Sequence, residues 1–262
     1  MPTRERTPIG APCWVDLMTS DVDGARAFYT RVFGWTAEDP NPEFGGYFSF
    51  LKDGIPVAGG MTNVAGEGVP DMWQVYLATE DAEATTARAT EHGGQEIVAP
   101  VQVGDLGKMA IVLDAGGAPI GIWQPMAFQG LALYDEPGAP RWFELNTKSY
   151  DGAADFYREV FGWTTEIMSD TPEFRYTVAV NNGENLAGIM DASGFLPEGV
   201  PAHWAVYFGI DDADATLARI VELGGAVVRP AEDTPYGRLA TATDPTGAMF
   251  KLVAPNEAMP AR

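Results

Sequence analysis

Two short segments of the sequence combine a tryptophan with a carboxylate two residues later. They are Trp14-Val15-Asp16 and Trp142-Phe143-Glu144, each inside an apolar run typical of a strand. Because side chains alternate along a strand, each tryptophan lies on the same face as its carboxylate. A carboxylate in a partly dry place has a raised pKa and can act as a general base, so Asp16 and Glu144 are the candidate catalytic residues. The alternative is an ordinary ion pair, for which the candidate cations are Lys251, Lys108 and Arg238.

Further aromatic and soft side chains lie on predicted strands around these pairs. Flat apolar rings favour stacking with a planar ligand, and ring faces together with an acidic surface attract a cation. The candidate ligand-binding residues are Trp14, Trp142, Trp73, Trp204, Gln74, Met61, Met190 and His203. The alternative is that the tryptophans fill a sheet face that no helix covers.

The two pairs recur because the chain is an internal duplication. Val32-Phe33-Gly34-Trp35 returns as Val160-Phe161-Gly162-Trp163, 128 residues later. Trp73-Gln74-Val75-Tyr76 returns as Trp204-Ala205-Val206-Tyr207, 131 residues later. The small drift in spacing indicates short insertions in loops.

The duplication and its composition predict the domain boundaries. We expect a first domain at 1–126, a linker at 127–140 that contains Pro and Gly, and a second domain at 141–262. Each half divides again: Asp21–Phe33 has helical periodicity and ends at Gly34, and short strand-like runs surround it. The prediction is an α+β fold of four strand-helix-strand-strand-strand units. One helix per unit leaves one sheet face to pair with a neighbour or to line a cleft.

Composition limits the kind of partner. The 262 residues include 16 Lys and Arg against 37 Asp and Glu, a formal charge of −21. Nucleic acids and anionic membranes both need basic side chains, so neither is an expected partner. The first residues lack an apolar signal segment, and the expected compartment is the cytoplasm. The single cysteine, Cys13, cannot form an internal disulfide.

Several motifs resemble those of the vicinal oxygen chelate superfamily, which includes glyoxalase I, bleomycin-resistance proteins and extradiol dioxygenases. They are the string Asp-x-x-x-Ala-x-x-Phe-Tyr-x-x-Val-Phe-Gly-Trp at Asp21–Trp35, its partial repeat at Asp151–Trp163, the segment from Asp211 to Gly225, and Asp244-Pro245-Thr246-Gly247. The chain is similar to tandem two-domain actinobacterial glyoxalase-like members. The resemblance implies two vicinal-oxygen-chelate domains, each with half-barrel clefts.

The same resemblance implies where a metal would be held. In metal-using members the ligands are His, Gln or Glu at inward strand positions. The matching positions here hold Trp14, Trp142, Gln74, Ala205, Gly121 and Lys251, and a further Glu is expected near Gly59–Met61 and Gly188–Met190. The usual ligand set is largely absent, so no cofactor is expected. The alternative is a divergent site of Glu144, His203 and Asp191 for a divalent metal such as Fe, Mn or Zn.

These observations lead to three hypotheses. The first is a glyoxalase- or bleomycin-resistance-like protein that binds a small aromatic or cationic metabolite or antibiotic in a metal-free cleft. The second is a metabolite-tailoring lyase, isomerase or dioxygenase-like hydroxylase that uses Glu144 or Asp16 as base, or a metal on Glu144 and His203; standard glyoxalase I chemistry is not expected. The third is a catalytically silent partner protein. The duplication predicts a monomer that is its own pseudo-dimer, with further dimerisation left open.

Overall fold

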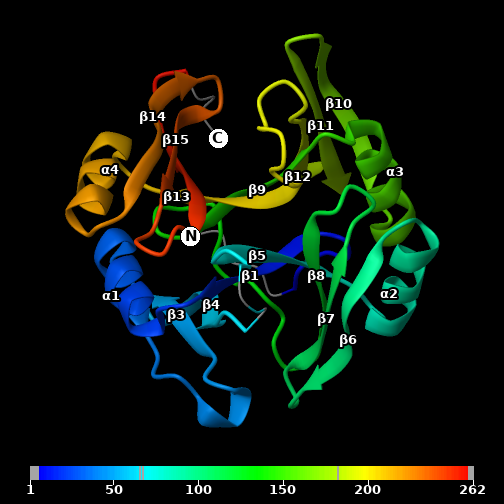
Figure 1. Cartoon of the computed structure of the whole chain (residues 1–262), viewed down its shortest axis with the longest axis horizontal. Helices are drawn as coiled ribbons and strands as arrows, with labels where there is room; N and C mark the ends of the chain where they lie inside the picture. Colours follow the sequence, from blue (N-terminus) through cyan, green and yellow to red (C-terminus); the bar gives the residue numbers. More distant parts are fainter. Residues whose placement is uncertain (1–5, 65, 67, 182, 259–262) are drawn as a thin grey trace.

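The computed structural model describes residues 6–258 except residues 65, 67 and 182, and it contains two eight-stranded sheets with two α-helices each (Figure 1). The first sheet is formed by the first half of the chain and the second sheet by the second half. The prediction of an α+β fold of two tandem domains is confirmed. Both sheets are open, and neither closes into a barrel.

The first domain contains two units in chain order. Its elements are β1 (Pro12–Thr19), α1 (Val22–Phe33), β2 (Thr36–Ala37), the short 3-10 helix η1 (Pro42–Phe44), β3 (Phe48–Lys52), β4 (Ile55–Thr62), β5 (Met72–Ala78), α2 (Ala82–Glu91), β6 (Gln95–Val103), β7 (Gly107–Leu113) and β8 (Pro119–Pro125). Strand order across the sheet is β2-β3-β4-β1-β5-β8-β7-β6.

The second domain repeats this plan. Its elements are β9 (Pro140–Thr147), α3 (Tyr150–Phe161), β10 (Thr164–Thr171), β11 (Phe174–Asn181), β12 (Glu184–Asp191), β13 (His203–Gly209), α4 (Ala213–Glu222), β14 (Ala226–Thr234), β15 (Gly237–Thr243) and β16 (Met249–Ala254). The order is β10-β11-β12-β9-β13-β16-β15-β14. The sequence left the pairing of the four units open; the structure joins the first with the second and the third with the fourth.

The first helix shows why the local sequence folds as it does. The side chain of Asp21 accepts a hydrogen bond from the Gly24 backbone at 2.9 Å and so caps the start of α1. Buried Ala25, Phe28 and Tyr29 fall on one face, as the periodicity predicted. The helix ends at Gly34, whose φ of 70° is left-handed and favours glycine.

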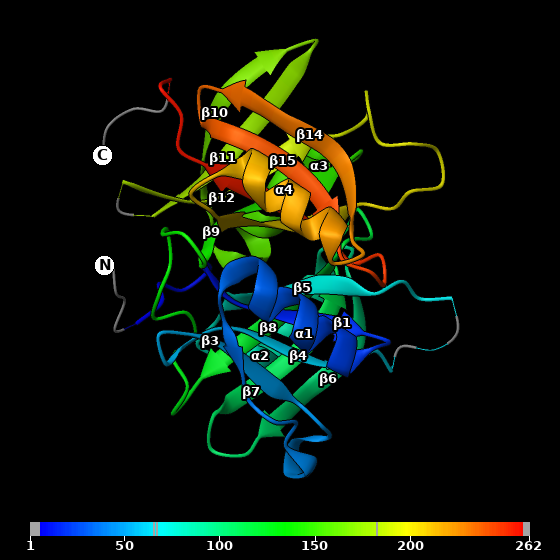
Figure 2. The ribbon, with the colours of Figure 1, turned by 90° about the vertical axis from the view of Figure 1, so that its left-hand side faces the viewer.

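The helix-covered faces of the two sheets pack against each other, and their other faces look away (Figures 1 and 2). Helix α1 lies beside α4, and α2 lies beside α3. Aromatic side chains from both domains fill the layer between the sheets: the Trp73 ring meets Phe208 edge-on at 5.1 Å, and Phe33 meets Phe208 at 5.0 Å. The two domains therefore share one core. We call the face of each sheet that looks away its outer face.

Hydrogen bonds cross this interface in a symmetric pattern. The Tyr29 hydroxyl of α1 donates to Asp244 of the second domain at 3.1 Å, and the Tyr157 hydroxyl of α3 donates to Asp114 of the first at 2.9 Å. Each carboxylate also accepts backbone N–H groups of its own turn. The family motif residues thus tie each domain's helix to the other domain's turn. No helix in the described part of the chain is long and apolar enough to cross a membrane.

Candidate functional site

A buried hydrogen-bonded group stands on the outer face of the first sheet. The Trp14 indole N–H lies 2.8 Å from Asp16 Oδ1 and 2.8 Å from the Tyr47 hydroxyl, and that hydroxyl donates to Asp16 Oδ1 at 2.7 Å. Strand alternation on β1 places the indole and the carboxylate together, as the sequence predicted. Tyr47 enters from the segment just before β3. Asp16 is 5% exposed, so hydrogen-bond donors of the protein, and not water, surround its carboxylate.

Burial governs the protonation of this group. It raises the pKa of Asp16 to about 6, although hydrogen bonds from Tyr47, Tyr76 and Trp14 oppose the rise. Burial, followed by the charge of Asp16, raises the pKa of Tyr47 well above its ordinary value. The carboxyl is therefore the group that titrates near neutral pH, while the phenols stay protonated.

The second domain carries the matching group with one addition. The Tyr176 hydroxyl accepts a hydrogen bond from the Trp142 indole at 2.8 Å and donates to Glu144 Oε2 at 3.1 Å. The Tyr207 hydroxyl donates to Glu144 Oε1 at 3.1 Å, and the Lys251 ammonium lies 2.6 Å from the same oxygen. Lys251 is the ion-pair partner that the sequence offered as an alternative. The other two candidates pair elsewhere, Lys108 with Glu83 and Arg238 with Asp214 and Asp233.

One position accounts for the difference in charge between the two groups. In the parallel pairing of β13 with β16, Lys251 lies opposite Tyr207, and in the pairing of β5 with β8, Gly121 lies opposite Tyr76. A Cβ at Gly121 would overlap the Tyr76 ring, so this ring occupies the room of the missing side chain. Among the described residues, no cation forms an ion pair with Asp16, whereas Glu144 has Lys251.

Two glycines explain how the tyrosines reach the carboxylates. Gly59 on β4 lies opposite Asp16, and Gly188 on β12 lies opposite Glu144. A Cβ at Gly59 would overlap the Tyr47 hydroxyl and the Asp16 carboxylate, and a Cβ at Gly188 would overlap the Tyr176 hydroxyl. These glycines fall where the family resemblance leads one to expect a ligating Glu. A phenol hydroxyl has taken that space in each domain.

The donor set does not fit a metal of the kind the family implies. The groups around each carboxylate are indole N–H, phenol O–H and, in the second domain, an ammonium; the indole and the ammonium have no lone pair to offer. In the described part of the chain, no cluster of three or more His, Cys, Asp or Glu side chains could hold a metal ion. The groups around the two carboxylates therefore do not form a metal site of that kind.

The structure does not bring together the alternative set of Glu144, His203 and Asp191. His203 pairs with Asn146 and so shares the outer face with Glu144, but Asp191 pairs with Thr147 and points to the opposite face. The Asp191 carboxylate binds Ser193 and Arg175 there. His203 contacts the Pro201 carbonyl at 3.1 Å, and burial lowers its pKa.

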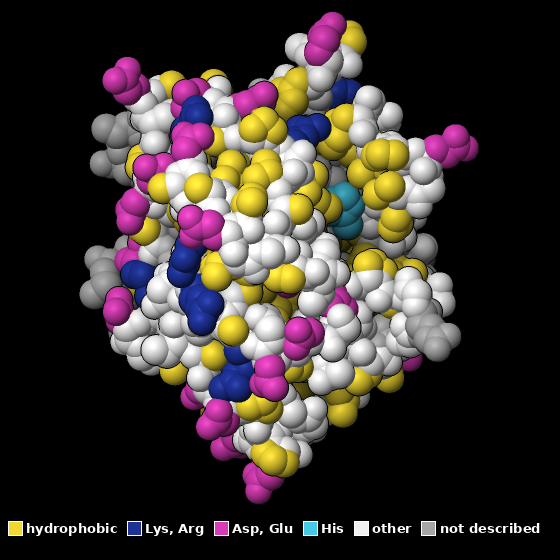
Figure 3. Space-filling model, turned by 60° about the vertical axis from the view of Figure 1, so that its left-hand side comes forward, with side chains coloured by type: hydrophobic (Ala, Val, Ile, Leu, Met, Phe, Trp, Pro, Cys, Tyr) yellow, Lys and Arg dark blue, Asp and Glu magenta, His cyan; other side chains and the backbone are white. Residues whose placement is uncertain are grey.

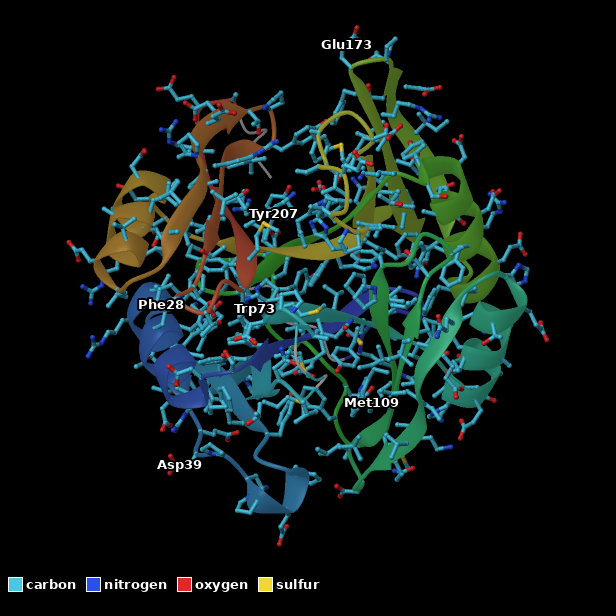
Figure 4. The ribbon with its side chains drawn as sticks, in the orientation of Figure 1. Phe28, Asp39, Trp73, Met109, Glu173 and Tyr207 are labelled. Atoms are coloured by element: carbon cyan, nitrogen blue, oxygen red, sulfur yellow. The ribbon has the colours of Figure 1, made fainter. Side chains whose placement is uncertain are left out.

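The proposed ligand-binding residues separate into two groups. Gln74, Met61 and Met190 lie on the outer faces, opposite Asp16, Met18 and Asn146 respectively. Trp73 and Trp204 lie instead in the shared core, 3% and 6% exposed, where their indoles donate to Tyr29 and Tyr157. Figure 4 labels Trp73 in the layer between the sheets and Tyr207 on the outer side of the second sheet. Strand alternation separates these tryptophans from Gln74 and His203, which lie on the other face of β5 and β13.

The surface of the protein is acidic overall, and its acidic side chains are not concentrated in one patch of the face shown in Figure 3. Figure 3 shows acidic side chains spread over the visible face, with basic side chains fewer. Two surface hollows have volumes of about 180 and 230 Å³, and neither is lined by residues of the Asp16 or Glu144 groups. In the first, the Arg175 guanidinium is already held by Asp151, Asp170 and Asp191. The candidate site on the outer faces is thus defined by the Asp16 and Glu144 groups and not by either hollow.

Fold, repeat and site position define a class of proteins built from paired β-α-β-β-β units. A model of the Glyoxalase/Bleomycin resistance protein/Dioxygenase superfamily matches residues 13–122 and 140–252, so the chain belongs to that superfamily. A Mycobacterium bovis protein with the provisional name glyoxylase CFP32 is 37% identical over 260 residues, covering 97% of this chain and 98% of its own. The anthracycline biosynthesis protein DnrV of Streptomyces peucetius is 38% identical over 271 residues, covering 96% of each chain.

A solved structure is similar in fold. The Mn(II)-bound glyoxalase of Novosphingobium aromaticivorans superposes with a TM-score of 0.64 over 94% of this chain and 82% of its own, at 16% identity. At that identity the likeness concerns the fold alone.

Proposed function

We propose that the protein binds a small aromatic metabolite or antibiotic, neutral or cationic, on an outer face without the help of a metal. The observation that carries the proposal is the carboxylate–tyrosine–tryptophan group, which takes the space of the ligating side chains expected in each domain. Indole and phenol groups next to a carboxylate suit a flat ring with polar substituents. The charge of −21 favours a cation over an anion at long range.

Relatives support the aromatic class of ligand. DnrV, and DauV of Streptomyces sp. strain C5, both carry the description anthracycline biosynthesis protein. An anthracycline combines fused planar rings with ring oxygens and an amino sugar. We therefore take an anthracycline as the first probe.

Isothermal titration calorimetry with daunorubicin tests the proposal. We expect micromolar or tighter binding by the wild-type chain, with no dependence on added Mn²⁺, Fe²⁺ or Zn²⁺. Extraction with a chelator before the titration is the matched control. Affinity no better than millimolar for daunorubicin and for a simple planar cation such as 9-(aminomethyl)anthracene would contradict the proposal.

A second candidate function is metal-free proton transfer by Asp16 in a lyase or isomerase reaction. The observation that favours it is the pKa of about 6, which leaves a strong fraction of carboxylate at neutral pH while retaining basicity. Deuterium exchange at C–H positions next to the ketone of bound daunorubicin, followed by NMR in D₂O, tests it. Exchange that equals the enzyme-free rate, or that persists in Asp16→Asn, would exclude this role.

A further inference from the structure

The outer face of the first domain is covered by the chain itself. Phe128, in the segment between the domains, meets the Trp14 ring edge-on with 4.8 Å between ring centroids and lies 6.0 Å from Trp123. Its carbonyl accepts the Trp123 indole N–H at 3.1 Å, and its backbone N–H binds the Leu106 carbonyl at 3.0 Å. Trp14 is consequently only 5% exposed. An aromatic ring of the protein already occupies the place where a planar ligand would contact Trp14.

The second domain has no such cover within the described residues. Trp142, the counterpart of Trp14, is half-buried, and no ring of the described chain packs against it. The counterpart of Trp123 is Val253, as the pairings Ala78–Trp123 and Gly209–Val253 show. Val253 is smaller than Trp123, and Trp142 is half-buried where Trp14 is 5% exposed.

Lys251 gives this place a specific polar contact. Its ammonium has three N–H donors, and in the described structure two of them point to Glu144 at 2.6 Å and Tyr207 at 3.0 Å. Both Glu144 oxygens already accept hydrogen bonds, and the Tyr176 and Tyr207 hydroxyls each donate and accept. The group is thus complete apart from one ammonium donor, which an oxygen acceptor on a ligand would satisfy.

Aromatic side chains also gather at the rim of this face. Phe174 is 37% exposed and stacks on Tyr176 with 5.6 Å between centroids. Phe195, in the connection between β12 and β13, lies under the Arg229 guanidinium of β14 at 5.5 Å and is 46% exposed. These two exposed rings lie toward opposite ends of the strand order and offer further contact area to a flat molecule.

We infer that the second domain alone receives the ligand, whose ring takes beside Trp142 the place that Phe128 takes beside Trp14. The ligand is a planar aromatic compound with a carbonyl or phenolic oxygen at its buried end, which accepts a hydrogen bond from Lys251. Any positive charge it carries points toward the acidic surface. This inference rests on the proposed function and narrows it to one site and one ligand chemistry.

Calorimetric stoichiometry with daunorubicin tests the choice of site. We expect one molecule per wild-type chain and a loss of at least tenfold in affinity for Trp142→Ala. Phe128→Ala uncovers Trp14, so we expect it to keep the affinity of the Trp142 site and to add a second site in the first domain. Trp142→Phe, which keeps a ring, is the second variant in case Trp142→Ala does not fold. Two molecules per wild-type chain, or a loss of affinity in Phe128→Ala without one in Trp142→Ala, would overturn the inference and leave the proposed function standing. No binding at all would instead remove the proposed function.

A pair of probes tests the contact with Lys251. Daunorubicin carries ring oxygens, and 9-(aminomethyl)anthracene is a planar amine without them. In the charge-balanced variant Glu144→Gln/Lys251→Met, we expect the affinity for daunorubicin to fall about tenfold relative to that for 9-(aminomethyl)anthracene, as loss of one hydrogen bond from an ammonium requires. An unchanged ratio of the two affinities would show that Lys251 does not contact the ligand oxygen.

Discussion

At the scale of single residues, the two domains surround a buried carboxylate with different partners. Each buries a carboxylate beside a tryptophan and a tyrosine; within the residues that the structure describes, Glu144 has a cation, Lys251, and Asp16 has none. Asp16 relies on neutral donors, and burial raises its pKa. The two equivalent positions therefore differ in their neighbours, which gives each a separate prediction.

The first prediction concerns Asp16. Its pKa is about 6 in the folded chain against an ordinary 3.8, so the protonated carboxyl favours folding. This contribution is fully present below the ordinary pKa and is lost as the pH rises through 6; the gap corresponds to about 3 kcal/mol. We expect Asp16→Asn to gain stability relative to wild type between pH 4 and pH 8, as measured by urea denaturation. A difference between the two proteins that does not vary with pH would contradict this.

The second prediction concerns Lys251. Lys251→Met leaves the buried carboxylate of Glu144 without its cation, and we expect a loss of about 3–5 kcal/mol in unfolding free energy. Glu144→Gln/Lys251→Met removes both charges and is expected to recover most of that loss. If the double variant is as unstable as the single one, packing of the Lys251 stem and not charge compensation explains the effect.

At the scale of elements, the strands determine how far the sequence can be interpreted. The repeat, the helix at Asp21–Phe33 and the shared face of Trp14 and Asp16 are all predictable, because spacing and alternation carry them. The facing of Trp73 follows from the same alternation, which places Trp73, Val75 and Leu77 on one side of Met72–Ala78 and Gln74 on the other, so Trp73 and Gln74 cannot share a face. Phe128 escapes prediction, because it lies in a segment without periodicity and its contact with Trp14 depends on the folded chain.

The sequence carries part of the signal for the contacts of Tyr47, just before β3, and Tyr176, on β11. Tyr47 and Tyr176 recur at matching places in the repeat, as do Gly59 and Gly188. A repeated glycine on a strand indicates close approach by another group. Only the strand pairing shows that each phenol approaches its glycine, which is why the link needs the structure.

The third prediction tests that close approach. Gly188→Ala places a methyl group where the Tyr176 hydroxyl stands, and we expect a loss of about 1–3 kcal/mol from the forced shift. Gly188→Ala/Tyr176→Phe removes the hydroxyl. We expect its loss in unfolding free energy, measured by thermal or urea denaturation, to be smaller than the sum of the losses of the two single variants. Strict additivity would mean that the methyl and the hydroxyl do not compete for space.

At the scale of the whole molecule, the two halves are joined through their helix-covered faces. Tyr29 and Tyr157 donate to carboxylates of the opposite domain, and Trp35 and Trp163 donate across to the carbonyls of Gly138 and Gly10. Aromatic rings from both halves pack between the sheets. Such an arrangement favours a chain that needs no second copy to complete its core.

The fourth prediction concerns this joint core. We expect a single cooperative transition in calorimetric unfolding, and a monomer of about 28 kDa in light scattering, matching the chain mass. Tyr29→Phe leaves the buried Asp244 and the Trp73 indole short of a partner and is expected to cost about 1–3 kcal/mol while keeping one transition. Two resolved transitions in the wild-type protein would show that the domains fold independently.

The crossed tyrosine–aspartate bonds also constrain how the duplicated halves can diverge over time. Each of these bonds joins a helix of one half to a turn of the other. A substitution at either end therefore removes a contact from both halves. On the outer faces, the described partners of each carboxylate group come from its own domain. There the two copies differ: one packs Phe128 against Trp14, and the other places Lys251 against Glu144.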